Sequence, residues 1–300
     1  MKSIMVLAIV FTFLLIPALP DDQLTQSEAL KRARASDWRT LDPENTLYME
    51  LETGRVIIEL APDFAPNHVA NIKALVRERF FDGLAIVRVQ ENYVVQWGDP
   101  HGEDPEKARE MKQAQRSLPP EFSVDCNDQL PFTPLPDPDP YAPEVGFVKG
   151  FPAARDTKTG KMWLTHCYGM VGAGRGNAPD SGSGAEMYVV CGHAPRHLDR
   201  NVTLFGRVIR GMELLTVLPR GKGVMGFYAP DQPLPRIQSI RLAAQVPESE
   251  RDKLEILRTD SRAFQAFIQA RRNRAEDWFL YKADGLDIGN IQVPRRVKDS

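Results

Sequence analysis

The sequence has little cysteine, with only Cys126, Cys167 and Cys191 in 300 residues. Three cysteines allow one intramolecular disulfide at most, or three free thiols, so a fold stapled by several disulfides is excluded. It also has little excess charge, because 38 basic and 40 acidic residues give a net charge of −2. No overall positive field is available for nucleic acid, and we expect no nucleic-acid partner.

Long apolar runs are lacking as well, apart from the N-terminus. There, Lys2 precedes an uncharged run from Ile4 to Ile16, a Pro-rich stretch and two aspartates. The run is shorter than the roughly 20 residues that span a bilayer. A secretory signal peptide over residues 1–20 is therefore favoured over a retained membrane anchor. We expect a bacterial chain that is exported to the periplasm or secreted, with no membrane span after signal cleavage.

The next residues combine a helical pattern with a strand pattern. Residues 21–45 form an expected N-terminal helical segment, with a short charged helix from Leu24 to Ala35. Apolar and polar residues then alternate from Leu47 to Leu51 and again from Val56 to Leu60, with Thr53-Gly54 between them. This alternation predicts a β-hairpin with one buried face.

Two helices and several short strands follow the hairpin. Apolar residues recur at helical spacing after Pro66, and a second short amphipathic helix fits Gly211 to Leu218. Many short strands with two helices predict a mainly β protein built as a closed antiparallel barrel. The strand patterns are Ala85–Val89, Tyr93–Gln96, Tyr168–Val171, Met187–Val190, Thr203–Ile209 and Ile237–Leu242.

Two additions flank or interrupt this pattern. Between residues 100 and 162 no period is recognisable, and Leu130–Pro143 is rich in proline, so we expect a long surface excursion, either a poorly ordered linker or a functional loop. The C-terminal extension, 243–300, is expected to be helical and to pack on the barrel. Its apolar residues at helical spacing are Leu254, Leu257, Phe264, Phe267 and Ile268.

Several kinds of catalytic site lack support. Cys191, His193 and His197 form C-x-H-x3-H, which is not a standard zinc pattern. The Gly-rich segment Gly169–Gly184 has neither a dinucleotide-binding fingerprint nor a Walker lysine, and Ser183 within it lacks the nucleophile elbow. We expect no metal and no cofactor.

A more specific signal comes from an ordered set of short stretches. They are Ile86–Val89, Tyr93–Asp99, Leu118–Phe122, Gly169–Gly176, Tyr188 with its neighbours, His197–Asp199 and Phe205–Glu213. In this order they resemble the motifs F-H-R-I, G-F-x-x-Q-G-G-D, x-x-x-E-F, G-x-x-x-M-A-x-A, S-Q-F-F-I, W/H-L-D and V-F-G-x-V-x-x-G-M-x of the cyclophilin family of peptidyl-prolyl cis/trans isomerases. The resemblance covers residues 46–218 and implies an eight-stranded barrel capped by two helices over 46–242.

The resemblance implies roles for ten residues. Arg88 matches the catalytic arginine, which donates to the prolyl nitrogen as the amide twists, and Gln96 matches the glutamine that orients it. The implied substrate-binding residues are Tyr93, Val94, Gly174, Arg175, Glu186, Tyr188, His197 and Leu198.

The chain also departs from the family pattern. Glu186 replaces a glutamine, which places a negative charge where it can hold Arg88 in an ion pair and lower turnover or change peptide preference. Val202 stands at the position of a pocket histidine or tyrosine, and Trp97 displaces a glycine. Arg196 is an extra residue before His197, so the alignment of His197 is ambiguous by one position.

Two functions remain. The first is a peptidyl-prolyl isomerase that acts on X-Pro bonds of exported proteins and assists their folding. The second is a catalytically weak proline-peptide-binding module or chaperone on the same fold. Both imply proline-containing polypeptides as partners, and we expect a monomer.

Overall fold

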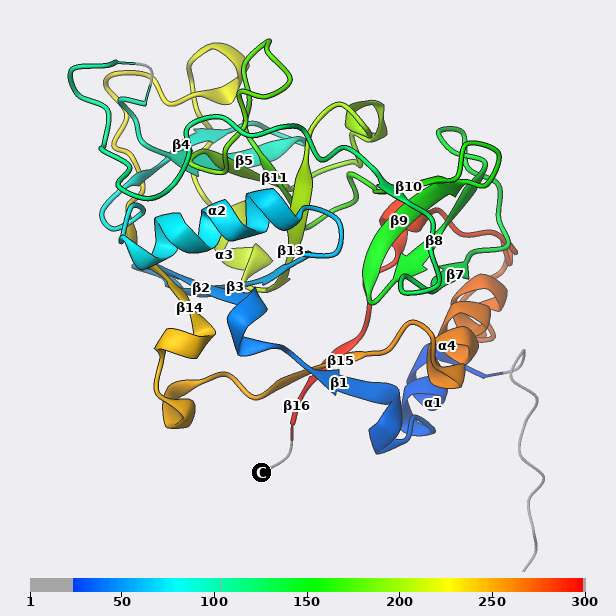
Figure 1. Ribbon diagram of the computed structural model, residues 1–300. Coiled ribbons are helices and arrows are strands. Elements are labelled where there is room, and N and C mark those ends of the chain that lie inside the picture. The colour runs from blue at the N-terminus through cyan, green and yellow to red at the C-terminus, as the bar shows by residue number, and fades with distance from the viewer. Residues whose placement is uncertain (1–23, 103, 299–300) are drawn as a thin grey trace, which may run out of the picture.

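The computed structural model describes residues 24–102 and 104–298. Its largest element is an eight-stranded antiparallel sheet with the strand order β14-β2-β3-β13-β11-β12-β5-β4 (Figure 1). These strands are β2 (Thr46–Leu51), β3 (Gly54–Leu60), β4 (Ala85–Val89), β5 (Val94–Gly98), β11 (Met170–Ala173), β12 (Met187–Val190), β13 (Leu204–Arg210) and β14 (Ile237–Leu242).

The two outermost strands, β4 and β14, are joined where they begin. Ile86 N–H donates to Pro235 O at 2.9 Å, and Ile237 N–H donates to Leu84 O at 2.8 Å. These bonds satisfy backbone groups that an open sheet edge would leave unpaired. The predicted mainly β fold with an eight-stranded antiparallel barrel is confirmed.

Helix α2 (Pro66–Arg77) covers one side of the barrel, as Figure 1 shows. Pro66 stands in the first turn, where its missing N–H costs nothing. The face that carries Val69, Ile72 and Leu75 is buried against the sheet. The second barrel helix, α3 (Met212–Thr216), follows Gly211, whose φ of +96° lies in the region that favours glycine. Both barrel helices occur where the sequence predicts them.

The region expected to be an irregular surface excursion contains a second sheet, so that expectation is wrong for residues 124–162. Proline in this region obscures the strand pattern in the sequence. Pro134 lies in β7, which is an edge strand of the sheet and pairs with β8. An edge strand tolerates a residue without a backbone N–H. The order is β6-β10-β9-β8-β7, formed by β6 (Val124–Asp125), β7 (Phe132–Pro134), β8 (Glu144–Val148), β9 (Phe151–Asp156) and β10 (Lys161–Leu164).

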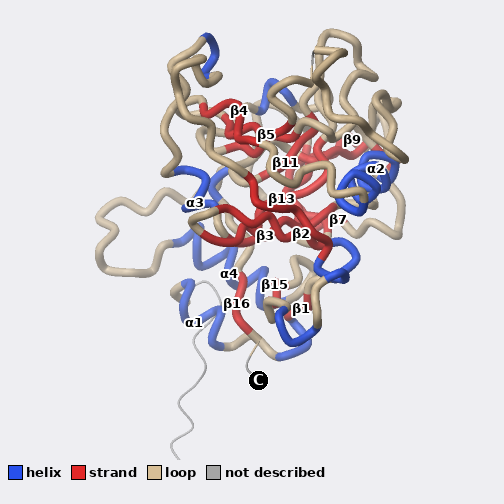
Figure 2. The backbone as a smooth tube through the Cα atoms, turned by 90° about the vertical axis from the view of Figure 1, so that its left-hand side faces the viewer, coloured by secondary structure: helices blue, strands red, loops and turns tan. Residues whose placement is uncertain are grey.

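The two ends of the described chain come together. Helix α1 (Gln26–Lys31) packs beside α4 (Arg262–Asn273), and a three-stranded sheet joins β1 (Trp38–Thr40), β15 (Leu254–Leu257) and β16 (Arg295–Val297), as Figures 1 and 2 show. Helix α1 is shorter than the predicted helix from Leu24 to Ala35. The capping box of Thr25 and Glu28 begins it, and Arg32 is its C-cap.

The C-terminal extension is only partly helical, which corrects the prediction for its first residues. Leu254 and Leu257 belong to strand β15, and every residue of that strand is buried. Leu254 and Leu257 are three residues apart, and this spacing fits a helix as well as a short strand. Helix α4 begins only at Arg262, where the Ser261 hydroxyl accepts from Phe264 N–H.

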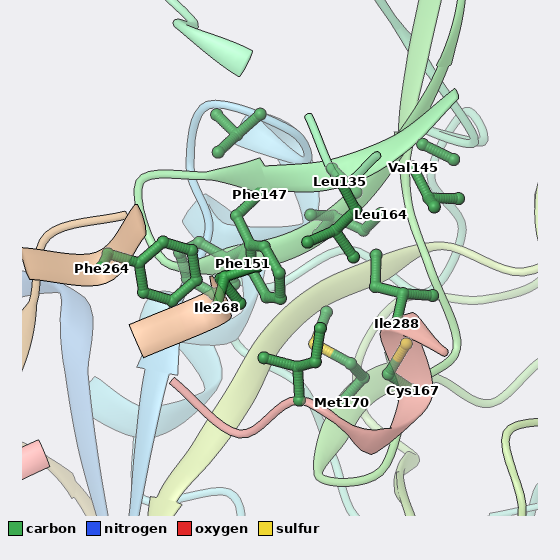
Figure 3. Close-up of a cluster of buried hydrophobic side chains, with 14 of the residues drawn as sticks. Leu135, Val145, Phe147, Phe151, Leu164, Cys167, Met170, Phe264, Ile268 and Ile288 are labelled. Carbon is green, nitrogen blue, oxygen red and sulfur yellow. The ribbon is translucent and has the colours of Figure 1, made fainter. Parts of the chain in front are cut away.

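One hydrophobic cluster connects the inserted sheet, α4 and the barrel (Figure 3). The rings of Phe147 and Phe264 meet edge to face with centroids 5.2 Å apart. Phe151 and Ile268 adjoin them, and Met170 of β11 extends the cluster to the barrel. The additions therefore share a core with the barrel.

A buried ion pair adds a polar link between the same parts. Arg207 of β13 donates to Glu59 of β3 at 2.9 Å and to Gly150 O of the insertion at 2.5 Å. Arg39 of β1 approaches the second oxygen of Glu59 at 2.6 Å. Both arginines hold the pKa of Glu59 below its usual value despite burial.

The predicted signal peptide, residues 1–20, lies outside the described residues. In the part of the chain that the structure describes, no helix is long and apolar enough to cross a membrane. All three cysteines are free thiols, with Cys126 exposed, Cys167 buried and Cys191 half-buried.

We predict that Phe264→Ala lowers the free energy of unfolding by about 3–5 kcal/mol, because truncating a buried Phe leaves a cavity in a close-packed core. Urea denaturation followed by fluorescence measures the change. Tyr281→Ala is the control, since Tyr281 is exposed, and we expect it to change stability by less than about 0.5 kcal/mol. Equal stability of the two variants would contradict the shared core.

Candidate active site

Arg88 and Gln96 lie opposite each other on β4 and β5. The register of the two strands shifts between Ile86 and Arg88, so that Ile86 pairs with Trp97 and Arg88 pairs with Gln96. A bulge of this kind re-aims a side chain. Here it places the guanidinium and the Gln96 amide on the same face of the sheet.

Three hydrogen bonds fix the direction of the Arg88 guanidinium. Its Nη1 donates to Gln96 Oε1 at 3.2 Å, its Nε donates to Met225 O at 2.7 Å, and its Nη2 donates to Gln90 Oε1. A guanidinium has five N–H groups. The bonds to the protein therefore leave it able to donate to a further acceptor.

The guanidinium also lies between two aromatic rings. Its central carbon is 5.4 Å from the ring centroid of Tyr93 and 5.2 Å from that of Phe227. Arg88 is 8% exposed, and burial lowers its pKa, while the charge of Glu186 opposes that shift. Because the pKa of arginine is so high, Arg88 stays protonated. The site thus holds a fixed cation that is largely shielded from water.

Gln96 connects Arg88 to Glu186. Gln96 Nε2 donates to Glu186 Oε1 at 2.5 Å while Gln96 Oε1 accepts from Arg88. A carboxylate can only accept and a guanidinium can only donate, so the amide has one consistent orientation. Glu186, which the sequence suggested as a direct partner of Arg88, acts on it through this amide and through its charge.

A pocket of about 270 Å³ opens beside Arg88. Tyr188 of β12 and Val94 of β5 supply buried apolar wall, because both are buried on the face that carries Gln96. Eight of the ten residues that the sequence singled out line the pocket, together with Ala173 and Val202. The eight are Arg88, Tyr93, Val94, Gln96, Gly174, Arg175, Tyr188 and Leu198.

The other two residues lie near the pocket without lining it. Glu186 is half-buried, and a Cβ at Gly174 would lie 3.3 Å from its Cγ. His197 is exposed in the short 3-10 helix Arg196–Leu198, whose last residue does reach the pocket. Arg175 turns its side chain onto the loop backbone, donating to Asn201 O at 2.8 Å.

The extra residue Arg196 is buried and paired. It donates to both carboxylate oxygens of Asp139, at 2.7 and 3.0 Å, and to Asp199 at 2.6 Å. These carboxylates raise its pKa above the usual value although burial opposes them. Asp139 lies in the Pro-rich part of the insertion, so this ion pair ties the insertion to the loop that carries Leu198.

Sequence reasoning did not identify Gln90, Met225 and Phe227 as neighbours of Arg88. The segment that carries the last two runs along β4, with Gly221 N–H donating to Val89 O at 3.0 Å. A Cβ at Gly226 would lie 2.7 Å from Gln90 Cα, so only glycine allows this approach. The glycines near Met225 were the only signal of such close contact.

The alternative metal site finds no support. Within residues 24–102 and 104–298, no three His, Cys, Asp or Glu side chains gather closely enough to hold a metal ion.

The chain is similar to several known proteins. The family described as "Cyclophilin type peptidyl-prolyl cis-trans isomerase/CLD" matches residues 46–241. A probable peptidyl-prolyl cis-trans isomerase of Brucella suis is 52% identical over 58 residues, which are 19% of this chain and 30% of the relative. The match thus spans under a third of that relative's length. Peptidyl-prolyl cis-trans isomerase B of Bacillus subtilis is 28% identical over 178 residues, 59% of this chain and 92% of the relative.

Among solved structures, cyclophilin AquaCyp293 from Hirschia baltica is similar with a TM-score of 0.71. The likeness covers 92% of this chain and 99% of that chain at 24% sequence identity. It shows the fold, and because it covers nearly the whole chain it reaches beyond residues 46–241.

We predict that Asp139→Ala lowers the free energy of unfolding by about 3 kcal/mol, because it removes one partner of a buried ion pair and leaves Arg196 less compensated. Chemical denaturation measures the loss. Asp128→Ala is the matched control, because Asp128 is exposed in the same insertion. A loss no larger than that of the control would show that the ion pair does not hold the insertion in place.

Proposed function

The chain belongs to the cyclophilin family of peptidyl-prolyl cis-trans isomerases, and we propose that it catalyses the cis/trans isomerisation of Xaa-Pro peptide bonds. The observation that carries this proposal is the fixed, shielded guanidinium of Arg88 at the edge of a small pocket with apolar walls. No bond is made or broken in the reaction, and no cofactor is required for it.

The chemistry of the reaction explains why such a cation suffices. Rotation about an amide C–N bond is opposed by a barrier of about 18–20 kcal/mol, because conjugation must be broken. As the bond twists, the lone pair localises on the prolyl nitrogen, and an N–H donor aimed at that nitrogen stabilises the twisted form more than either planar form. Arg88 supplies this donor, and its anchored position means that little reorganisation is needed.

The pocket supplies the second requirement, which is to hold the prolyl ring still while the rest of the chain turns. Val94, Tyr188 and Leu198 offer apolar surface to a ring without polar groups. Gln96 keeps the guanidinium beside that surface, since its own amide is held by Glu186. The free energy gained by binding the prolyl ring then offsets part of the free energy needed to twist the peptide bond.

The proposal extends to the setting in which the protein acts. The N-terminal sequence from Lys2 to Ile16 supports export to the periplasm or secretion. Exported proteins that contain proline are then the substrates. The protein assists their folding, since prolyl isomerisation is slow enough to limit folding. We propose that it acts as a monomer.

The second candidate function is a proline-peptide-binding module or chaperone with little turnover. The charge of Glu186 beside Gln96 favours it, because this carboxylate strengthens the hold on the resting Arg88. The two functions share the pocket and differ only in whether the bound bond turns faster than in water.

We predict that Arg88→Ala lowers kcat/KM for an Ala-Pro peptide about 100-fold, the effect of losing one preorganised donor in an active site. A protease-coupled assay measures the rates. Arg262→Ala is the control, because Arg262 is exposed on α4, and we expect it to act like wild type. A wild-type rate no faster than buffer supports the binding module, and full activity of Arg88→Ala contradicts the role of Arg88.

We compare two peptides that carry either lysine or glutamate at the Xaa position of the Xaa-Pro bond. We predict that Glu186→Gln lowers the ratio of their kcat/KM values, lysine over glutamate, about fivefold, the effect of removing one charge near a protein surface. Gln96 keeps its orientation in this variant, since a glutamine oxygen at position 186 still accepts from Gln96 Nε2. Comparing kcat/KM for the two peptides gives the ratio. Glu248→Gln, at an exposed position, is the control, and an unchanged ratio in Glu186→Gln would remove Glu186 from peptide selection.

A further inference from the structure

A chain of buried hydrogen bonds runs behind the pocket and ends on Tyr188. The Tyr188 hydroxyl lies 2.8 Å from His166 Nε2, and the two rings are nearly parallel, 9° apart. His166 Nδ1 lies 2.9 Å from Asp199 Oδ1, which also accepts from the His166 backbone N–H at 2.9 Å. Tyr188 lines the pocket, whereas His166 and Asp199 do not.

The chemistry of these groups fixes the direction of each bond. The Asp199 carboxylate can only accept, so His166 Nδ1 carries the proton and Nε2 is the acceptor of a neutral imidazole. The Tyr188 hydroxyl therefore donates to His166. Burial lowers the pKa of His166 and raises the pKa of Tyr188 well above its usual value, which keeps both groups neutral.

The backbone opposite Tyr188 leaves room for the phenol. Gly172 of β11 pairs with Tyr188 in the sheet register. A Cβ at Gly172 would lie 2.4 Å from the phenol oxygen and 2.5 Å from Cζ, closer than real Cβ contacts. The site thus provides two features that the hydroxyl requires, which are space at Gly172 and an acceptor at His166.

The far end of the chain is anchored in the insertion. Asp199 Oδ2 accepts from Arg196 Nε at 2.6 Å, and Arg196 in turn holds Asp139. The side chains of His166, Asp199, Arg196 and Asp139 are between 0% and 6% exposed. Asp139 of the Pro-rich segment is therefore linked to the pocket residue Tyr188 through three buried side chains, those of Arg196, Asp199 and His166.

We propose that His166 is a positioning residue for peptide binding: with Asp199 it holds the Tyr188 hydroxyl behind the pocket, so that the ring and not the hydroxyl faces the bound proline. This inference rests on the proposed function of the pocket. Without the acceptor, a buried phenol is left unsatisfied, which is unfavourable. Because Tyr188 lines the pocket, we expect the unsatisfied hydroxyl to turn toward it, which moves the ring into the space that the proline occupies.

The test compares His166→Leu, Tyr188→Phe and the double variant, with His193→Leu at an exposed histidine as the control. We expect His166→Leu to raise KM and the Kd for an Ala-Pro peptide about tenfold, as for one unsatisfied buried group, with kcat nearly unchanged. The double variant binds the peptide more tightly than His166→Leu does, because no hydroxyl remains to be satisfied. Unchanged affinity in His166→Leu, or a double variant as weak as the single one, overturns the proposal.

A second measurement needs no substitution, should His166→Leu fail to fold. Nitrogen-15 NMR of the imidazoles in the wild-type protein is expected to show His166 as the neutral Nδ1–H tautomer near neutral pH, and the Nε2–H tautomer or an imidazolium there would overturn the proposal.

The Kd for the peptide is measured by NMR titration and does not depend on turnover. Failure of the proposed isomerase activity is therefore distinguishable from failure of this inference.

Discussion

The site depends on one constraint, which is that the Arg88 guanidinium must stay charged and keep its direction while protein covers most of it. Burial of a cation is unfavourable unless acceptors surround it. Gln90, Gln96 and Met225 supply those acceptors, and two aromatic rings flank the charge. A donor held in this way needs little rearrangement when charge develops on a substrate nitrogen.

Other parts of the molecule hold Arg88 in place or shape the pocket beside it. The bulge in β4 and the closed barrel set Arg88 against Gln96. Glu186 fixes the amide of Gln96, and the loop around Met225 completes the hold on Arg88. On the other side of the pocket, the insertion reaches the wall through Arg196, so a segment remote in sequence shapes the surface that meets the substrate.

The sequence predicts the barrel well because the hairpin residues Leu47–Leu60 alternate and turn residues separate the other short strands. Strands β4, β12 and β14 have the predicted bounds, and α2 begins at Pro66. The inserted sheet escaped prediction because its prolines mark an edge strand, β7. Strand β15 escaped because Leu254 and Leu257 stand at a spacing that also fits a helix. For the site, motif order placed eight of the ten residues around one pocket. Contacts from Met225 and His166 depend on tertiary folding, which no local pattern encodes.

The most direct test of the central claim is exchange NMR on an Ala-Pro peptide with the wild-type protein at substoichiometric concentration. The account predicts cis–trans exchange cross-peaks at mixing times of about a second or less, whereas the uncatalysed process takes tens to hundreds of seconds. Peptide shift changes that report binding at the pocket, without exchange above the buffer rate, would contradict catalysis by Arg88.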